Sequence, residues 1–303
     1  AIKLQTYTPD TQTINSHKKW FWIKKGRKWG GQTLYDLYRK AYTPWDWHPK
    51  LKAYAEKHKL IFFSTPFDES AVKFLETLNV QLYKVASFEN EDTSLLESIG
   101  KTNKPVILSR GLLSFLAIKR ALSILRSVGS SNVAVLHCIS AYPAPLEQMN
   151  LATLPDLQKK IKVITGLSDH SLGNIAAITS VALGGKIIEK HITLSRTDGG
   201  LDAEFSLESH EFKRMVIAIR DVEKAIGHVR YTPNKNEIHN TLYKRSLFAV
   251  NNIAPKEKFS VENVRSIRPG YGLPPHFYKQ ILGKKSTRRI PRGTPLQWIH
   301  IAK

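Results

Sequence analysis

Lysine, serine and histidine side chains recur directly after short apolar runs in the first two thirds of the chain. These strand-end candidates are Lys3, Gln5, Thr65, Lys84, Ser87, Ser109, Ser140, Ser168, His170 and His191. Lysine supplies a compact positive charge and hydroxyl groups supply hydrogen bonds, so this set suits an anionic group such as phosphate. The chain has no GxxxxGK[ST] loop, which argues against a nucleotide-phosphate cradle.

Two of these histidines end successive strand candidates, His170 in GLSDHS and His191 in IEKH. Two imidazoles rarely complete a structural site, but they suit a catalytic divalent metal with positions left for substrate and water. Each histidine taken alone is equally compatible with a hydrogen-bonded residue at a strand end. Spacing leaves both readings open.

Acidic and aromatic neighbours leave further alternatives. Asp169 and Glu189 flank the histidines and either orient them, transfer protons or form structural salt bridges. The stretch YTPWDWH (42–48) either stacks on a sugar or fastens a helix to the core. Cys138 ends an apolar run without an evident activating base, so we do not predict a cysteine nucleophile.

The elements that would position these residues alternate along the chain. Apolar runs at 61–63, 82–86, 105–108, 133–137, 162–167 and 186–189 are separated by helical patterns such as 69–78, 115–128 and 174–184, and the last helix covers 210–226. Together with Ile2–Gln5 they give seven strands of a parallel sheet. Eight would close a barrel. No GxGxxG turn follows the first strand, and polar residues cluster after nearly every run, so a barrel is favoured over a doubly wound sheet.

A second unit follows this α/β region of residues 1–227. Residues 228–243 are polar without clear periodicity and are predicted to be a linker. Residues 244–303 contain the β-rich pieces SLFAV, FSVENVRSI and QWIHI between PGYGLPP and IPRGTPL, which predicts a compact β-rich module.

Charge and cysteine content bound the class of protein. The chain has 46 Lys and Arg against 25 Asp and Glu, a net charge of +21, and residues 244–303 hold 13 of the former and two of the latter. The basic residues are scattered, so we interpret them as a solvated surface or as steering of anionic substrates, in preference to nucleic-acid binding. One cysteine, no signal-like start and no long apolar segment predict a cytoplasmic protein without a membrane span.

Six ordered motifs resemble those of the sialic acid synthase superfamily. They are FSTPFD (63–68), YKVASFE (83–89), LHCISAYPAP (136–145), GLSDHSLG (166–173), IEKHITLSR (188–196) and RSIRPGYGLPP (265–275). QTYTPDT (5–11), LYDLYRKAYTPWDWH (34–48) and SAYPAPLE (140–147) are similar to the pseudaminic acid branch in particular. Ser140, where sialic acid synthases usually have asparagine, agrees with that branch.

The resemblance implies a (β/α)₈ TIM-type barrel, a linker and an antifreeze-like (SAF) module exchanged within a homodimer. It implies that phosphoenolpyruvate condenses with an open-chain N-acetylated sugar of the 2,4-diacetamido-2,4,6-trideoxy-altrose type to give pseudaminic acid and phosphate. The cofactor it implies is a divalent cation, Mn²⁺ with Mg²⁺ or Co²⁺ as alternatives. Small-molecule substrates are then the partners besides a second copy, with no nucleic acid and no membrane.

The resemblance also assigns roles to residues of this chain. The phosphoenolpyruvate set is Lys3, Thr65, Lys84, Ser87, Ser109, Ser140 and Ser168. The sugar set is Gln5, Tyr142, Asp202 and Arg268, with Arg268 reaching a partner subunit's barrel. Glu89, Glu189 and Asp202 are the expected catalytic residues, and His170 and His191 are the expected metal ligands.

Two departures from the family pattern accompany the resemblance. Arg110 in ILSRG replaces a small residue and either adds a phosphate contact or crowds the site. The family's first strand, with its Glu and Asn-His motif, has no counterpart, so we expect a barrel of seven strands in a truncated chain. The alternatives are synthesis of N-acetylneuraminic or legionaminic acid, a truncated inactive homologue, and a polyanion-binding protein with a degenerate barrel.

Overall fold

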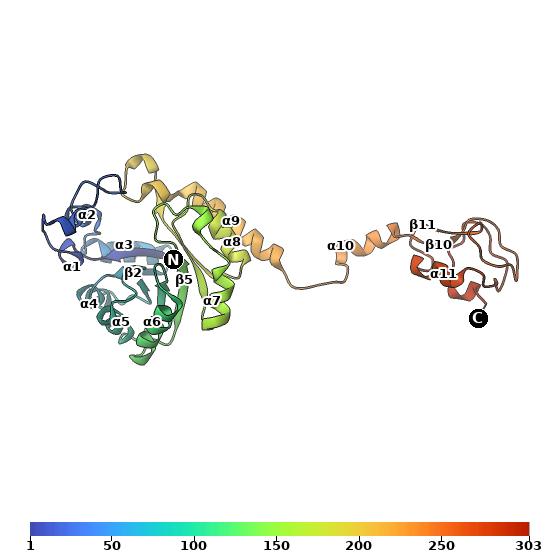
Figure 1. Cartoon of the computed structure of the whole chain (residues 1–303), viewed down its shortest axis with the longest axis horizontal. Coiled ribbons are helices and arrows are strands. Elements are labelled where there is room, and N and C mark those ends of the chain that lie inside the picture. The colour runs from blue at the N-terminus through green and yellow to red at the C-terminus, as the bar shows by residue number, and fades with distance from the viewer. Residues whose placement is uncertain (303) are drawn as a thin grey trace. The chain divides into compact units, whose positions relative to one another are not determined.

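The computed structural model describes residues 1–302. The chain divides into two compact units, Ala1–Gly227 and His228–Lys303. Figure 1 labels the helices and strands of both.

A parallel sheet of seven strands forms the centre of the first unit. The strands are β1 Ile2–Thr6, β2 Phe62–Pro66, β3 Tyr83–Val85, β4 Val106–Ser109, β5 Val133–Cys138, β6 Thr165–Asp169 and β7 Ile187–Lys190. They pair in sequence order, which leaves β1 and β7 as the two edges of this sheet in residues 1–302. The expected α/β barrel-type architecture with seven strands is confirmed.

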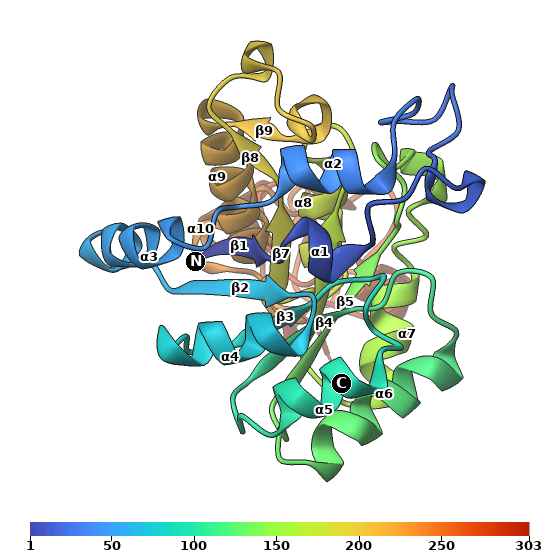
Figure 2. The same cartoon turned by 90° about the vertical axis from the view of Figure 1, so that its left-hand side faces the viewer.

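Helices connect the strands and cover the outer face of the curled sheet, as Figure 2 shows for α4, α5 and α6. The helices are α1 Pro9–Gln12, α2 Leu34–Ala41, α3 Trp47–Lys57, α4 Glu69–Thr77, α5 Thr93–Gly100, α6 Phe115–Ser127, α7 Thr153–Ile161, α8 Ile175–Ala182 and α9 Ser209–Ile226. Several begin at a residue whose side chain accepts the free N–H groups of the first turn, such as Asp68 before α4 and Ser114 before α6.

Alternation along each strand separates the core from the site. Tyr83 and Val85 on β3 pack with Leu108 on β4 in the apolar core, which also includes helix residues such as Leu75. Lys84, between them, therefore faces the interior of the curled sheet. The polar residues among apolar neighbours in these strands mark the inner face.

A short parallel pair extends the chain beyond β7. Strands β8 Ile192–Thr193 and β9 Leu207–Glu208 pair with each other, and the Leu207 amide donates to the His191 carbonyl at 2.9 Å. His191 is thus held between β7 and β8. Neither short strand was predicted from the sequence.

The second unit has its own apolar core, formed by residues such as Leu247, Phe259 and Ile290. Strands β10 Ser246–Ala249 and β11 Val264–Ile267 pair antiparallel, as the pieces SLFAV and FSVENVRSI predicted, and α11 covers Tyr278–Ile281. The prediction of a strand at QWIHI was wrong, because Trp298–His300 forms a 3₁₀ turn.

Two short helical segments occupy the stretch predicted to be an irregular linker. They are α10 Lys235–Ile238 and the 3₁₀ turn His239–Tyr243. Asn234 and Glu237 form a capping box that starts α10, which explains a turn of helix without an apolar periodicity. Within residues 1–302, none of the helices combines the length and hydropathy needed to cross a bilayer.

Candidate active site

A cavity of about 790 Å³ lies at the carboxyl ends of the strands of the first unit. Its floor is built from inward-facing residues of the strands or their ends. These are Lys3, Gln5, Lys84, Ser109, Cys138, Ser168, Glu189 and His191. Active sites of parallel α/β barrels lie at this end, where residues from different strands converge.

Two lysines and a glutamate form the charged centre of the floor. The Lys3 ammonium lies 3.2 Å from one Glu189 oxygen, and Lys84 lies 3.9 Å from the other. Lys84 is only 1% exposed and donates to the Ser109 hydroxyl and the Val85 carbonyl, both at 2.7 Å. Two cations facing one carboxylate leave positive charge available for an anionic ligand.

Burial and these charges shift the pKa values of the floor residues. Burial lowers the pKa of Lys84 to about 8, against the attraction of Glu189. Burial opposes ionisation of Glu189 as well, but the charges of Lys3 and Lys84 outweigh it and hold its pKa at about 2. At neutral pH Glu189 is therefore ionised and Lys84 is mostly protonated.

His170 and His191 lie beside this centre, with ring centroids 5.5 Å apart. His170 Nδ1 lies 3.1 Å from the Ile139 carbonyl, which can only accept, so Nδ1 carries the proton and Nε2 keeps its lone pair. His191 Nδ1 lies 3.6 Å from an Asp202 carboxylate oxygen. Burial lowers the pKa of His170, and burial together with His170 and Lys3 lowers that of His191 to about 3.

Neutral imidazoles at this spacing fit a divalent cation bound by both rings. Nowhere in residues 1–302 do three or more His, Cys, Asp or Glu side chains gather in a way that could hold a metal ion. The chain thus offers two donors, and water or substrate would complete the coordination.

Comparison with known proteins places this geometry in a family. The NeuB family pattern matches residues 1–231, and the SAF domain pattern matches residues 244–302. The chain belongs to the NeuB family. It is 40% identical to the pseudaminic acid synthase of Campylobacter jejuni (strain 81-176) over 297 residues, 98% of this chain and 86% of that protein. The pseudaminic acid synthase of Helicobacter pylori is 39% identical over 97% of this chain and 87% of its own length.

Solved structures of NeuB-like proteins agree with the fold. The N-acetylneuraminic acid synthetase of Leptospira borgpetersenii in complex with citrate superposes with a TM-score of 0.69, at 32% identity over 79% of each chain. The spore coat polysaccharide biosynthesis protein SpsE of Bacillus subtilis gives a TM-score of 0.63 at 28% identity, over 100% of this chain and 87% of that one.

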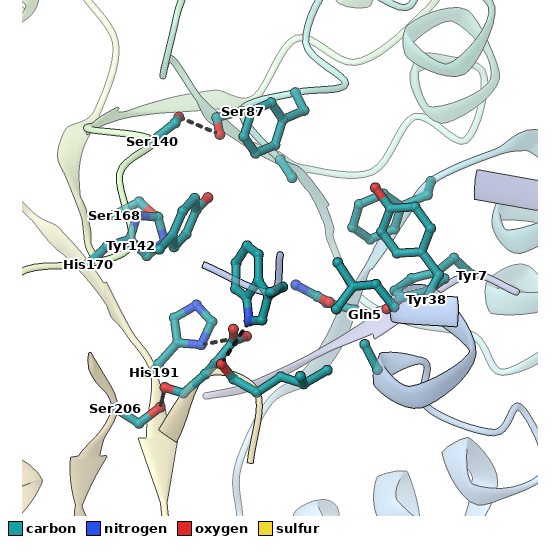
Figure 3. A pocket seen from close by; sticks show the side chains of 18 of the residues that line it. Gln5, Tyr7, Tyr38, Ser87, Ser140, Tyr142, Ser168, His170, His191 and Ser206 are labelled. Atoms are coloured by element: carbon teal, nitrogen blue, oxygen red, sulfur yellow. Dashed lines mark hydrogen bonds and ion pairs between the residues drawn. The ribbon is translucent and has the colours of Figure 1, made fainter. Parts of the chain in front are cut away.

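Figure 3 shows the serines of this NeuB-family site grouped with the histidines. The Ser140 hydroxyl donates to Ser87 at 2.9 Å, and the Ser168 hydroxyl lies 3.3 Å from Glu189. A Cβ at Gly111 would lie 2.3 Å from the Ser140 hydroxyl, so a glycine is needed for that serine to reach its place. Thr65 is the exception in the expected anion set: it pairs in register with Gln5 but does not line the cavity.

Two further carboxyl groups of the expected catalytic set, Glu89 and Asp202, line the cavity. Burial raises the pKa of Glu89 to about 7, and one of its oxygens is buried without a hydrogen-bond partner in residues 1–302. Burial also raises the pKa of Asp202, against the charges of Lys28 and Lys3. Glu89 is thus able to carry or release a proton near neutral pH.

Contacts outside the cavity decide the alternatives left open for Asp169 and Arg110. Asp169 pairs with Lys190 at 2.8 Å, and both side chains are fully buried. Asp169 is therefore part of a structural salt bridge and does not act as a proton-transfer group. The reason is strand alternation: Ser168 faces the cavity, so its neighbour faces away. The Arg110 guanidinium is held by His137 at 2.8 Å and does not line the cavity.

The aromatic stretch 42–48 fastens helices and does not line the cavity. The Trp45 ring stacks on Phe74 of α4 at 4.7 Å, and its N–H donates to the Tyr7 carbonyl. The expected sugar residue Tyr142 lines the cavity, whereas Arg268 is an exposed residue of the second unit.

The aromatic and apolar lining was missed in the sequence. Trp29 lines the cavity, and its N–H donates to the Leu201 carbonyl at 3.1 Å. Beside it, the Lys28 ammonium lies 2.6 Å from Glu204 and 4.6 Å from the centre of the Phe205 ring. These contacts fasten the long β1–α2 connection to the segment before β9. The irregular run WFWIKKGRKW carries no periodicity that would have indicated this.

Proposed function

We propose that this chain condenses phosphoenolpyruvate with an open-chain 2,4-diacetamido-2,4,6-trideoxy sugar to give pseudaminic acid and phosphate. The observation that carries the proposal is the pair of cations in the cavity floor, the half-buried Lys3 and the buried Lys84, beside serine hydroxyls and two neutral imidazoles. The likeness to pseudaminic acid synthases over 98% of the chain supports the choice of acceptor. The enzyme is then a transferase of the sugar-acid synthase class.

In the proposed reaction, C3 of phosphoenolpyruvate forms a bond to the aldehyde carbon, and the aldehyde oxygen takes a proton and becomes a hydroxyl. Water then adds at C2, and the bond between C2 and the phosphate oxygen breaks. Lys3, Lys84 and the hydroxyls of Ser87, Ser109, Ser140 and Ser168 bind the anionic groups and orient the enol. Glu89 would give the proton to the developing alkoxide, a role that its pKa of about 7 supports.

A divalent cation is the cofactor that fits His170 and His191, since sugar-acid synthases of this family are generally metal-dependent. When bound, it supplies Lewis-acid polarisation of the acceptor's aldehyde. We propose Mn²⁺, with Mg²⁺ or Co²⁺ as alternatives, because imidazole with water and carbonyl oxygen suits such ions. Asp202 orients the His191 ring and faces the same space as the sugar residues Gln5 and Tyr142.

We further propose residues 1–227 as the synthase domain, 228–243 as a linker and 244–303 as a module that acts on a second copy. Arg268, exposed in that module, would contact the sugar in the partner's barrel. Chains carrying Arg268→Ala and His191→Ala, each inactive alone, should regain part of the activity when mixed. Mixed dimers without recovery would reject the exchange.

The function is tested by incubating the chain with phosphoenolpyruvate, Mn²⁺ and the diacetamido sugar. Mass spectrometry should show the nine-carbon acid, and phosphate should appear in equal amount. Reactions with N-acetylmannosamine and with the legionaminic precursor are run beside it. Product from one of these acceptors alone would replace pseudaminic acid with the corresponding acid.

A further inference from the structure

The cavity has two chemically different ends. Figure 3 shows Ser87, Ser140, Ser168, His170 and His191 on one side and Tyr7 and Tyr38 on the other, with Gln5 between them. The second side is apolar and aromatic. Besides these two tyrosines it includes Phe67, which packs on Tyr7, and Leu34 and Leu37, which share α2 with Tyr38.

This apolar end is built by the connection between β1 and β2. Leu34, Leu37 and Tyr38 lie on one face of α2 because their spacing of three and four residues matches the helical repeat. Thr33 caps the helix, since its hydroxyl accepts from the Asp36 amide at 3.1 Å. The Tyr7 ring packs edge-on against Tyr38 at 5.8 Å and Phe67 at 5.1 Å. The wall is therefore a packed surface with a fixed shape.

One unused hydrogen-bond donor lines the same cavity. The side-chain nitrogen of Gln12 is buried and has no hydrogen-bond partner in residues 1–302. Gln12 ends α1, which packs against α2. Lys40, the nearby cation in the lining, already donates to Gln32 at 2.8 Å. A buried donor without a partner is costly, so it is expected to be satisfied by a bound group.

We propose that this end of the cavity binds an acetamido group of the acceptor sugar. An acetamido group combines a methyl, which gains by leaving water, with a carbonyl oxygen that accepts one or two hydrogen bonds. The α2 wall takes the methyl, and the Gln12 N–H donates to the carbonyl oxygen. A hydroxyl in place of the acetamido group would bring no methyl to the apolar wall of Leu34 and Leu37.

The inference rests on the proposed function, because the acetamido group that binds at the apolar end belongs to the acceptor sugar of that function. It assigns specificity to Gln12 and Leu34, which lie in a different part of the chain from the serines and lysines of the anion site. Changes here should therefore alter the use of acceptors and leave the apparent KM for phosphoenolpyruvate unchanged.

The test compares three acceptors: the diacetamido sugar and its two analogues in which one acetyl group is replaced by formyl. Loss of one methyl from a fitted apolar pocket lowers kcat/KM by roughly 10-fold or more. Wild type should show this preference for acetyl at one of the two nitrogens. In Leu34→Ser the preference at that nitrogen should fall close to one.

Gln12→Leu should lower kcat/KM for the diacetamido sugar by roughly 10-fold or more, as expected when a hydrogen bond to substrate is lost. The matched control is Gln81→Leu, an exposed glutamine that precedes β3 at the opposite end of the sheet. Leu34 is only partly buried, and an unchanged KM for phosphoenolpyruvate in both variants would show that the fold is retained.

Two outcomes separate the inference from the function on which it rests. If wild type condenses the diacetamido sugar but both variants keep its acetyl preference and its kcat/KM, the acetamido site is wrong and the proposed function stands. If wild type turns over N-acetylmannosamine and not the diacetamido sugar, the proposed function itself is wrong and the assignment of this site falls with it.

Discussion

Lys84→Met is expected to lower kcat/KM for phosphoenolpyruvate by about 10²–10³ or more, the usual cost of removing a preorganised group that stabilises developing charge. Its ammonium is buried, donates to Ser109 at 2.7 Å and faces the cavity. Methionine has a similar length and no charge, so the shape of the floor is kept. Steady-state kinetics at saturating acceptor measure the effect, with Lys104→Met as control because Lys104 pairs with Glu76 outside the cavity.

The fold of this variant should not suffer. Burial of the Lys84 ammonium is unfavourable, as its lowered pKa shows, so removing its charge should not destabilise the fold. Glu189 is not left unpaired in this variant, because Lys3 lies 3.2 Å from it. The pKa of Lys84 is about 8 in the folded chain and about 10.4 in the unfolded chain. Between pH 8 and 10 the folded chain therefore binds fewer protons than the unfolded chain. Below pH 8 the Lys84 charge lowers the free energy of unfolding. Thermal unfolding at pH 7 should give a Tm for Lys84→Met equal to or above that of wild type.

The same residue should set the alkaline limb of activity. Loss of the Lys84 proton above a pKa of about 8 removes a cation from the free enzyme, so kcat/KM for phosphoenolpyruvate should fall with a limb near pH 8. A flat profile between pH 7 and 9.5, or wild-type kinetics in Lys84→Met, would contradict the role given to this lysine.

His170→Ala and His191→Ala should each abolish metal-stimulated activity. Each should weaken Mn²⁺ binding by at least about 10- to 100-fold, the loss that is typical when only a hydrogen-bond partner of a metal ligand is removed. Each variant leaves a single imidazole in the cavity. Calorimetric titration with Mn²⁺ measures affinity without any dependence on turnover. Both chains should keep the secondary structure of wild type, because neither ring supports the main apolar core.

A matched control for these variants is His137→Ala. His137 is fully buried one strand away, where its Nε2–H donates to the Met149 carbonyl at 2.6 Å and Nδ1 accepts from Arg110. It does not line the cavity, so its loss should lower stability and leave Mn²⁺ affinity unchanged. Equal Mn²⁺ affinity in wild type and in both site variants would remove the metal assignment.

The inner face of the sheet could be predicted from the sequence because parallel strands are nearly all apolar. A charged side chain within YKV or IIEK would be unfavourable in the apolar core, so it is expected to face a cavity. The same logic left Asp169 undecided between a site residue and a structural salt bridge, since a run ending SDH does not show which residue faces inward. The register that pairs Asp169 with Lys190 is a property of two strands together.

The aromatic end of the cavity was beyond prediction for a different reason. Tyr7, Trp29 and Tyr38 come from the long connection between β1 and β2, which is irregular apart from short helices such as α2. Their convergence depends on contacts such as Lys28 with Glu204, 176 residues apart. In the second unit, QWIHI had the composition of a strand, but a capping box of Gln297 and His300 closes it into a 3₁₀ turn. The side-chain hydrogen bonds of this capping box outweigh the β propensity of the residues between them.

The division of the cavity between strands and connections has a consequence for how this family diversifies. The floor belongs to the sheet, where altering one residue disturbs its neighbours on two strands. Most of the proposed acceptor wall belongs to residues 7–41 and 200–206, which lie outside the seven-stranded sheet, although Gln5 comes from β1. Members of the family can therefore change their acceptor sugar through changes in these connections. The strand residues that form the carbon–carbon bond can stay the same.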